Sequence, residues 1–68
     1  MEKRFIVVTS AYSGNKGDKL TLSVDGIGGM LIQNGSTLLK HITHIYGGYE
    51  VYETVDEILE LIKKSKPI

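Results

Sequence analysis

The segment Thr54–Ser65 constrains the fold more than any other part of the chain, because it carries a complete helix pattern. Thr54 and Glu57 have the spacing of a capping box, in which each side chain accepts a hydrogen bond from the other residue's backbone N–H. The pattern predicts a helix over Val55–Ser65, stopped before Pro67. Apolar residues form one stripe along it: Val55, Ile58, Leu59, Leu61 and Ile62. A helix this short is marginal alone, so this stripe must dock on a sheet, and Ile58→Asp or Leu59→Asp is expected to unfold the protein.

The first part of that sheet is predicted by two apolar runs. Phe5–Thr9 is β-branched and aromatic, which is the composition of a strand buried on both faces or in mid-sheet. Leu20–Val24 alternates apolar and hydroxyl residues, which predicts one buried and one solvated face. The turn-rich stretch Ser10–Lys19 between them predicts a β-hairpin with a long, mobile loop.

Glycine and asparagine mark the turns between the remaining strands of the sheet. Gly26–Gly29 predicts a turn or bulge rather than a phosphate-binding loop, because Leu31 stands where the dinucleotide fingerprint needs its third glycine. Asn34-Gly35 is the dipeptide of a type I′ hairpin turn. Strands are expected at Met30–Ile32, Ser36–Tyr46 and Tyr49–Glu53, the last two on either side of Gly47-Gly48.

These elements predict an α+β fold, in which a small antiparallel sheet of four or five strands is packed by the C-terminal helix. With 68 residues, the chain has room for a single domain, residues 1–68, with a thin core. It has no cysteine, which excludes disulfides and thiolate zinc sites. Small scaffolds without such staples often gain stability from a partner subunit, so we expect self-association and no cofactor.

The charge balance bears on the partners of the chain. Eight basic and eight acidic residues give a formal charge of zero, whereas a nucleic-acid binder normally concentrates positive charge. Nucleic-acid binding is therefore the lesser alternative, through Lys3, Arg4, Lys16, Lys19 and Lys40. No run approaches the ~20 apolar residues of a membrane span, and the start lacks a secretory core. We expect a cytoplasmic protein that does not bind membranes.

Two histidines are the first candidate site residues. His41 and His44 would point to opposite sides of the expected strand, which argues against a shared metal ion. Further ligands would have to come from distant carboxylates such as Glu50 or Glu53. Structural or surface roles are expected for both rings, and a metal-binding or pH-sensing role is the alternative.

Three tyrosines bracket the last hairpin and form the second candidate group. Tyr46, Tyr49 and Tyr52 offer large rings with polar tips, which are enriched at protein interfaces. Cross-strand packing inside the hairpin is the competing explanation. We take these tyrosines, with His41 and His44, as the candidate interaction surface, and predict no catalytic residue and no metal site.

The segments Arg4–Thr9 and Gly48–Ile62 resemble very short bacterial and phage proteins. In these a β-meander opens with a Phe-Ile-x-Val-Thr-like strand and ends in a strand and a Glu-Ser/Thr-Val-Glu/Asp-Glu-Ile/Val helix. The small flagellar FlbD/SwrD family has this layout. The middle of the chain, Gly26–Ile45, departs from that family, which has an Asn-Gly-Lys turn after the first strand and a compact Pro-Asp-Thr hairpin. The resemblance implies the architecture and carries over no site.

The function expected from these observations is a non-enzymatic interaction module. We expect it to form a homodimer or higher oligomer and to bind a protein partner or a small ligand, for example as a phage or mobile-element accessory or inhibitor protein. The partner would be a second copy or a host or bacterial protein. A small nucleic-acid-binding protein is the first alternative, and an enzyme with an active site shared between subunits is the second.

Overall fold

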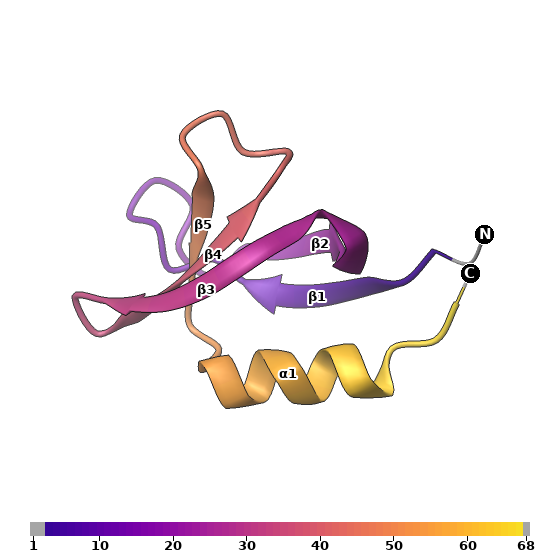
Figure 1. The fold of residues 1–68 in the computed structure, drawn as a ribbon. Helices are drawn as coiled ribbons and strands as arrows, with labels where there is room; N and C mark the ends of the chain where they lie inside the picture. Colours follow the sequence, from indigo (N-terminus) through magenta and orange to yellow (C-terminus); the bar gives the residue numbers. More distant parts are fainter. Residues whose placement is uncertain (1–2, 68) are drawn as a thin grey trace.

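The computed structural model describes residues 3–67 and confirms the α+β fold with a C-terminal helix (Figure 1). Five strands, one 3₁₀ turn and one helix follow one another along the chain. They are β1 (Phe5–Thr9), β2 (Lys19–Ser23), η1 (Val24–Gly26), β3 (Ile27–Gln33), β4 (Ser36–His41), β5 (Gly48–Val51) and α1 (Val55–Lys64). The order along the chain therefore matches the predicted succession of strands, with the helix placed last.

The strands form two small antiparallel sheets where a single sheet was expected. β1 pairs with β2, and β3, β4 and β5 form a second sheet in that order. The sheets meet at one isolated bridge between Ser10 and Val51. There the Ala11 N–H donates to the Glu50 carbonyl and the Tyr52 N–H donates to the Thr9 carbonyl, both at 2.9 Å. The 3₁₀ turn η1 redirects the chain from one sheet to the other, so that both sheets can face one core.

That core lies between the two sheets and the helix. Six apolar side chains are buried in it: Ile6, Val8, Leu22, Leu39, Val51 and Ile58. The prediction that β1 is buried on both faces or in mid-sheet is wrong, because Phe5 and Val7 point outward and are partly exposed. β1 has a layer of protein on one side only, so its β-branched composition reports strand propensity rather than burial.

The helix α1 begins with the predicted capping box and packs on β1 and β3. The Thr54 side chain accepts from the Glu57 N–H at 3.1 Å, and the Glu57 carboxylate accepts from the Thr54 N–H at 3.0 Å. Ile58 is fully buried under the sheets, whereas Leu59 is 50% exposed. The predicted apolar stripe is therefore wider than the surface on which the helix packs, and Leu59 at its side remains partly exposed to solvent.

A carboxylate clamp joins the start of this helix to the first sheet. Glu53, in the connection between β5 and α1, accepts hydrogen bonds from the Thr9 N–H at 2.8 and 3.0 Å and from the Thr9 hydroxyl at 3.0 Å. Lys19 donates to the same hydroxyl at 2.8 Å. β5 ends at Val51 rather than at Glu53 as predicted, because the Glu53 side chain holds the chain against β1.

Glycines place a bulge in β3, as predicted, but inside a longer strand. The expected strand Met30–Ile32 extends over Ile27–Gln33, with the pairing register shifted between Ile27 and Gly29. The hairpin turn to β4 has positive φ at both central positions, 51° at Asn34 and 80° at Gly35, which confirms the predicted type I′ pattern.

The predicted strand Ser36–Tyr46 is too long, because β4 ends at His41. Two turns follow, closed by the His44 N–H to the His41 carbonyl at 3.1 Å and the Gly47 N–H to the His44 carbonyl at 3.0 Å. Ile42 and Ile45 lie in these turns with their side chains in solvent. No strand within residues 3–67 pairs with this segment, so their β-branched shape does not extend the sheet.

Candidate functional site

The two histidines lie in different environments, and only His44 lines a cavity. His41 is the last residue of β4, is 4% exposed and belongs to a hydrogen-bonded cluster. His44 lies in the following turn. The prediction that the two rings point to opposite sides of one strand is wrong, since only His41 is in a strand.

We call the surroundings of His41 the closed corner; it consists of His41, Ser23, Gly26, Thr43 and the Tyr49 hydroxyl. The Thr43 N–H donates to His41 Nδ1 at 3.2 Å, so that nitrogen carries no proton. The ring proton is then on Nε2, which lies 2.9 Å from the Ser23 carbonyl and donates to it. The Thr43 hydroxyl lies 2.8 Å from Nδ1 and 3.0 Å from the Tyr49 hydroxyl, which extends the chain of hydrogen bonds.

Gly26 is required by the same corner because the His41 ring lies directly against it. A Cβ added at Gly26 would come within 2.5 Å of His41 Cε1 and 2.6 Å of Nε2. The Ile42 N–H donates to the Gly26 carbonyl at 2.9 Å and holds the start of the turn against η1. These contacts give His41 a structural role, in which a neutral ring ties the end of β4 to the turn between β2 and β3.

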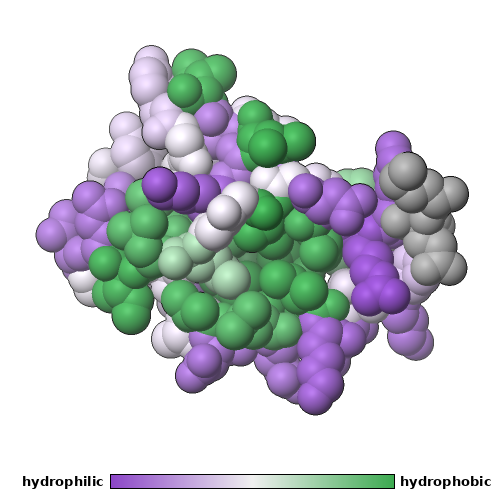
Figure 2. Space-filling view, viewed as in Figure 1, coloured by the Kyte–Doolittle hydropathy of each residue, from purple (hydrophilic) through white to green (hydrophobic). Residues whose placement is uncertain are grey.

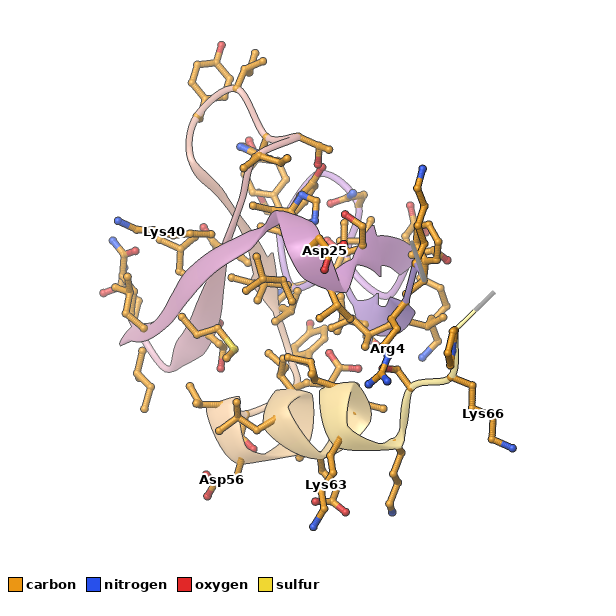
Figure 3. All side chains as sticks on the ribbon, turned by 45° about the vertical axis from the view of Figure 1, so that its right-hand side comes forward. Arg4, Asp25, Lys40, Asp56, Lys63 and Lys66 are labelled. Carbon is orange, nitrogen blue, oxygen red and sulfur yellow. The ribbon has the colours of Figure 1, made fainter. Side chains whose placement is uncertain are left out.

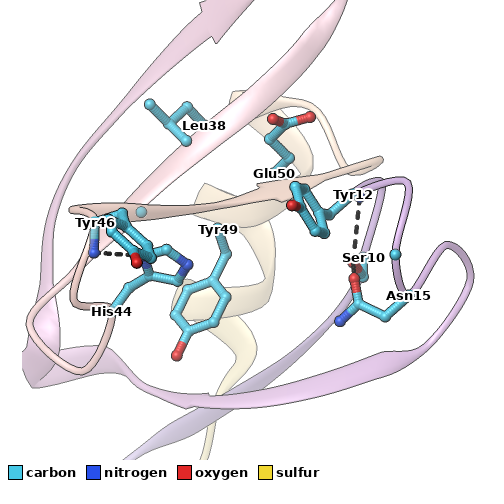
Figure 4. Close-up of a pocket in the computed structure, with 10 residues that line it drawn as sticks. Ser10, Tyr12, Asn15, Leu38, His44, Tyr46, Tyr49 and Glu50 are labelled. Atoms are coloured by element: carbon cyan, nitrogen blue, oxygen red, sulfur yellow. Dashed lines mark hydrogen bonds between the residues drawn. The ribbon is translucent and has the colours of Figure 1, made fainter.

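A cavity of about 660 Å³ lies between two loops at the end of β5 (Figure 4). We call it the loop groove. One wall comes from the β1–β2 loop, the other from the β4–β5 loop, and β4 and β5 form its floor. Its lining residues are Ser10, Tyr12, Gly14, Asn15, Leu38, His44, Tyr46, Gly48, Tyr49 and Glu50.

The β1–β2 loop is a hydrogen-bonded wall. The Ser10 N–H donates to the Asp18 carbonyl and the Gly17 N–H donates back to the Ser10 carbonyl, both at 2.8 Å. The Ser10 hydroxyl donates to the Asn15 side-chain oxygen at 2.8 Å. Tyr12 lies over Gly14, where an added Cβ would be 3.1 Å from the tyrosine ring. The loop is long, as predicted, and its hydrogen bonds define a specific turn that presents Tyr12.

The β4–β5 loop forms an aromatic wall. The His44 ring makes edge contacts with both tyrosines, with ring centres 4.7 Å apart for Tyr49 and 6.0 Å apart for Tyr46. The Tyr46 N–H donates to His44 Nδ1 at 3.1 Å, which orients the imidazole and leaves that nitrogen without a proton. Tyr46 itself is 87% exposed, so its ring is available to a ligand.

The floor of the loop groove contains an unpaired strand edge. Backbone groups of alternate residues point to opposite sides of a strand, so Gly48 and Glu50 both point away from β4. The Glu50 carbonyl is bonded to Ala11. Among residues 3–67, no backbone or side-chain partner joins the Glu50 N–H or the Gly48 groups on this side. These groups can pair with an added strand.

The structure brings together three of the five predicted site residues. His44, Tyr46 and Tyr49 line the loop groove, whereas His41 lies in the closed corner and Tyr52 lies beyond the Ser10–Val51 bridge. The sequence reasoning missed Tyr12, which reaches the groove only because that bridge brings the β1–β2 loop beside β5. Its one sequence signal was that it is an aromatic residue in a turn-rich loop.

Within residues 3–67 no three His, Asp or Glu side chains converge as metal ligands would. In the same range, no helix is long and apolar enough to cross a membrane.

Comparison with known proteins does not add to the site. No family model matches the chain, and no curated protein or solved structure has significant similarity to it. The resemblance to the FlbD/SwrD layout therefore stays a prediction from the sequence.

Proposed function

We propose that this chain is a non-enzymatic interaction module that binds an extended segment of a partner protein in the loop groove. One observation carries the proposal: the open edge of β5 lies at the floor of a cavity whose two walls present exposed tyrosines. Addition of a strand to such an edge is a common way to bind a peptide, with backbone hydrogen bonds for affinity and pockets for selectivity. Tyrosine suits such walls because it buries a large ring and keeps a polar tip.

The hydrogen bonds that the polar side chains make within the protein support binding rather than catalysis. The Ser10 hydroxyl is bonded to Asn15, the Glu53 carboxylate holds Thr9, and His41 holds the Ser23 carbonyl. A nucleophile needs a base beside it and a base needs a group that orients it. Here the groups of these types are used to hold loops together.

The distribution of charge favours a protein partner over nucleic acid. Arg4, Lys40, Lys63 and Lys66 point in different directions from the fold, rather than along one face (Figure 3). Glu50 is the charged residue that lines the loop groove, and it would repel a phosphate backbone. The cysteine-free composition is compatible with a cytoplasmic location and with a role as a phage or bacterial accessory protein, which we include in the proposal.

Selection of displayed peptides on the immobilised protein tests the proposal. The matched variants are Tyr46→Ser, which removes a groove wall, and Tyr52→Ser, which removes an exposed tyrosine outside the groove. We expect peptides enriched on the wild-type protein to lose at least ~10-fold in affinity for Tyr46→Ser, as for a hot-spot aromatic, and to bind Tyr52→Ser unchanged. Equal loss with both variants, or no enrichment, would contradict the proposal.

A second surface supports the proposal that the chain associates with copies of itself. Hydrophobic side chains gather over α1 and β3 on the face shown in Figure 2. Leu59 and Ile32 are exposed there, and Met30, Val55 and Ile62 are partly covered. β3 is also an outer strand, and the formal charge of zero gives two copies no net repulsion. A second copy can pair along β3, so that each copy covers the apolar face of the other.

Native mass spectrometry of the purified protein tests this association. Ile32→Lys places a charge in the apolar face of β3, and Ile42→Lys places one at an equally exposed isoleucine on the β4–β5 loop. We expect a dimer for the wild-type protein and for Ile42→Lys, and a monomer for Ile32→Lys. A wild-type monomer at micromolar concentration would contradict self-association and leave the loop groove proposal unaffected.

A further inference from the structure

We infer that the loop groove selects a cationic side chain, an arginine or a lysine, on the extended segment it binds. The inference rests on the proposed function and specifies its ligand class. It follows from the charge of the lining, the exposed aromatic rings and the unpaired acceptors of the groove.

The lining carries a negative charge. Among the ten lining residues, Glu50 is the one acidic residue, and the lining contains no lysine or arginine. Glu50 lies on the exposed side of β5, opposite Leu38. Within residues 3–67 the one ion pair is Lys64–Glu60 on α1, at 3.5 Å, so the Glu50 carboxylate is free to pair with a ligand. His44 adds no charge while its Nδ1 accepts from the Tyr46 N–H.

Aromatic rings line the same groove as this carboxylate. Tyr12 lies beside Glu50 at one end of the loop groove, and the His44–Tyr46–Tyr49 cluster lies at the other (Figure 4). The Tyr12 and Tyr46 rings are 58% and 87% exposed. The face of an aromatic ring is electron-rich and attracts ammonium and guanidinium groups. A carboxylate beside such a face adds a charge-assisted hydrogen bond to the same cation.

The remaining polar groups also suit a donor-rich ligand. Among residues 3–67 the Gly48 carbonyl has no hydrogen-bond partner at the strand edge, and the Tyr12 and Tyr46 hydroxyls can accept. A planar guanidinium, with five N–H donors, can bond the carboxylate and stack on a ring at the same time. Lys40 is a cation of the protein itself that could compete with a ligand for the Glu50 carboxylate. It lies opposite Gly48 on β4 and makes no ion pair with Glu50.

Titration of the ¹⁵N-labelled protein with N-acetyl-arginine amide, and separately with N-acetyl-citrulline amide, tests the inference. The two probes have nearly the same shape and differ in charge. We expect the arginine probe to shift the amide signals of Tyr12, Tyr46 and Glu50 saturably. The citrulline probe should bind at least ~3-fold more weakly, because it lacks the charge that pairs with the Glu50 carboxylate and contacts the rings. Glu50→Gln should remove most of this preference, and Lys40→Gln should preserve or strengthen it.

The outcomes separate this inference from the proposed function. Equal binding of both probes, or an unchanged preference in Glu50→Gln, overturns the cationic ligand class. If displayed peptides selected through Tyr46 are then neutral or acidic, the peptide-binding groove stands while its selectivity for cations fails. If the arginine probe is selected and the enriched peptides carry arginine or lysine, both are supported.

Discussion

The closed corner and the loop groove contain the same kinds of side chain. They differ in how many of the polar groups and ring faces of those side chains are still available to a ligand. In the closed corner, both nitrogens of His41 have partners and the ring lies against Gly26. In the loop groove, His44 is held by one backbone N–H, and Tyr46 is almost entirely in solvent. Tyr49 belongs to both, since its hydroxyl meets Thr43 while its ring lines the groove.

Residue type alone therefore does not identify a binding site in so small a fold. A buried group whose hydrogen bonds are all made contributes stability and order. A group that is positioned by the backbone but leaves its face open can bind something else. Matched pairs of like residues, one engaged and one open, test this distinction across the molecule.

The helix gives the pair with the largest expected effect. Ile58 is fully buried, and Leu59, the next residue, is half exposed. Ile58→Asp buries a charge at a cost of ~4 kcal/mol or more, against a total stability of roughly 3–10 kcal/mol for a chain of this size. We expect that variant to be unfolded by circular dichroism. The sequence predicted that Leu59→Asp would also unfold the protein, but because Leu59 is half exposed we now expect that variant to melt within a few degrees of wild type. Equal unfolding of both would mean that α1 docks differently.

The two histidines are the second pair. His41→Ala removes a buried ring and leaves the Ser23 carbonyl and the Thr43 N–H without partners, which should cost about 3 kcal/mol. His44→Ala should cost less than ~1 kcal/mol, because its ring lies at the surface. Urea unfolding curves followed by tyrosine fluorescence measure both free energies of unfolding. A larger loss from His44→Ala would reverse the assignment of the two sites.

Two glycines are the third pair. Gly26→Ala would place a methyl group against the His41 ring and should cost about 2 kcal/mol through forced rearrangement. Gly28→Ala is the control, since an added Cβ there has nothing within 4 Å. Its effect should lie within ~0.5 kcal/mol of wild type. Thermal melts of the two alanine variants, recorded in parallel, compare them; similar melting temperatures would show that the His41 ring is not pressed on Gly26.

The threonine at the boundary of the two regions has the smallest expected effect. Thr43→Val keeps the shape and removes the hydroxyl that links His41 to Tyr49, at a cost of about 1 kcal/mol. Thr21→Val, on the exposed side of β2, should stay within ~0.5 kcal/mol of wild type. Chemical unfolding resolves the two variants. A loss from Thr21→Val as large as that from Thr43→Val would remove the evidence for the link.

Local rules explain why much of the fold could be predicted from the sequence. The capping box at Thr54, the apolar stripe of α1 and the Asn34-Gly35 turn depend on neighbours within a few residues, and the structure has each of them. The end of β4 could not be predicted in this way. Ile42 and Ile45 have strand propensity, but in the described part of the chain no strand pairs with them, and backbone hydrogen bonds close two turns there.

The candidate site was predictable only in part, for a related reason. Tyr46 and Tyr49 are close in the chain, so their proximity follows from the hairpin itself. Tyr12 joins them through the Ser10–Val51 bridge, which is a contact between distant segments and leaves no periodic signal. The separation of His41 from His44 likewise depends on the close approach of η1, through Gly26, to the end of β4.

In this protein the loop groove is proposed to bind the partner, and the closed corner to support the groove. The most direct test is a ¹H–¹⁵N correlation spectrum of the wild-type protein with a peptide enriched by display. We expect the largest amide shifts at Tyr12, Tyr46, Gly48 and Glu50, with Ile58 and Leu59 on α1 nearly unmoved. Shifts concentrated on α1 and β3, with the loop groove unchanged, would contradict it and assign partner binding to the apolar face.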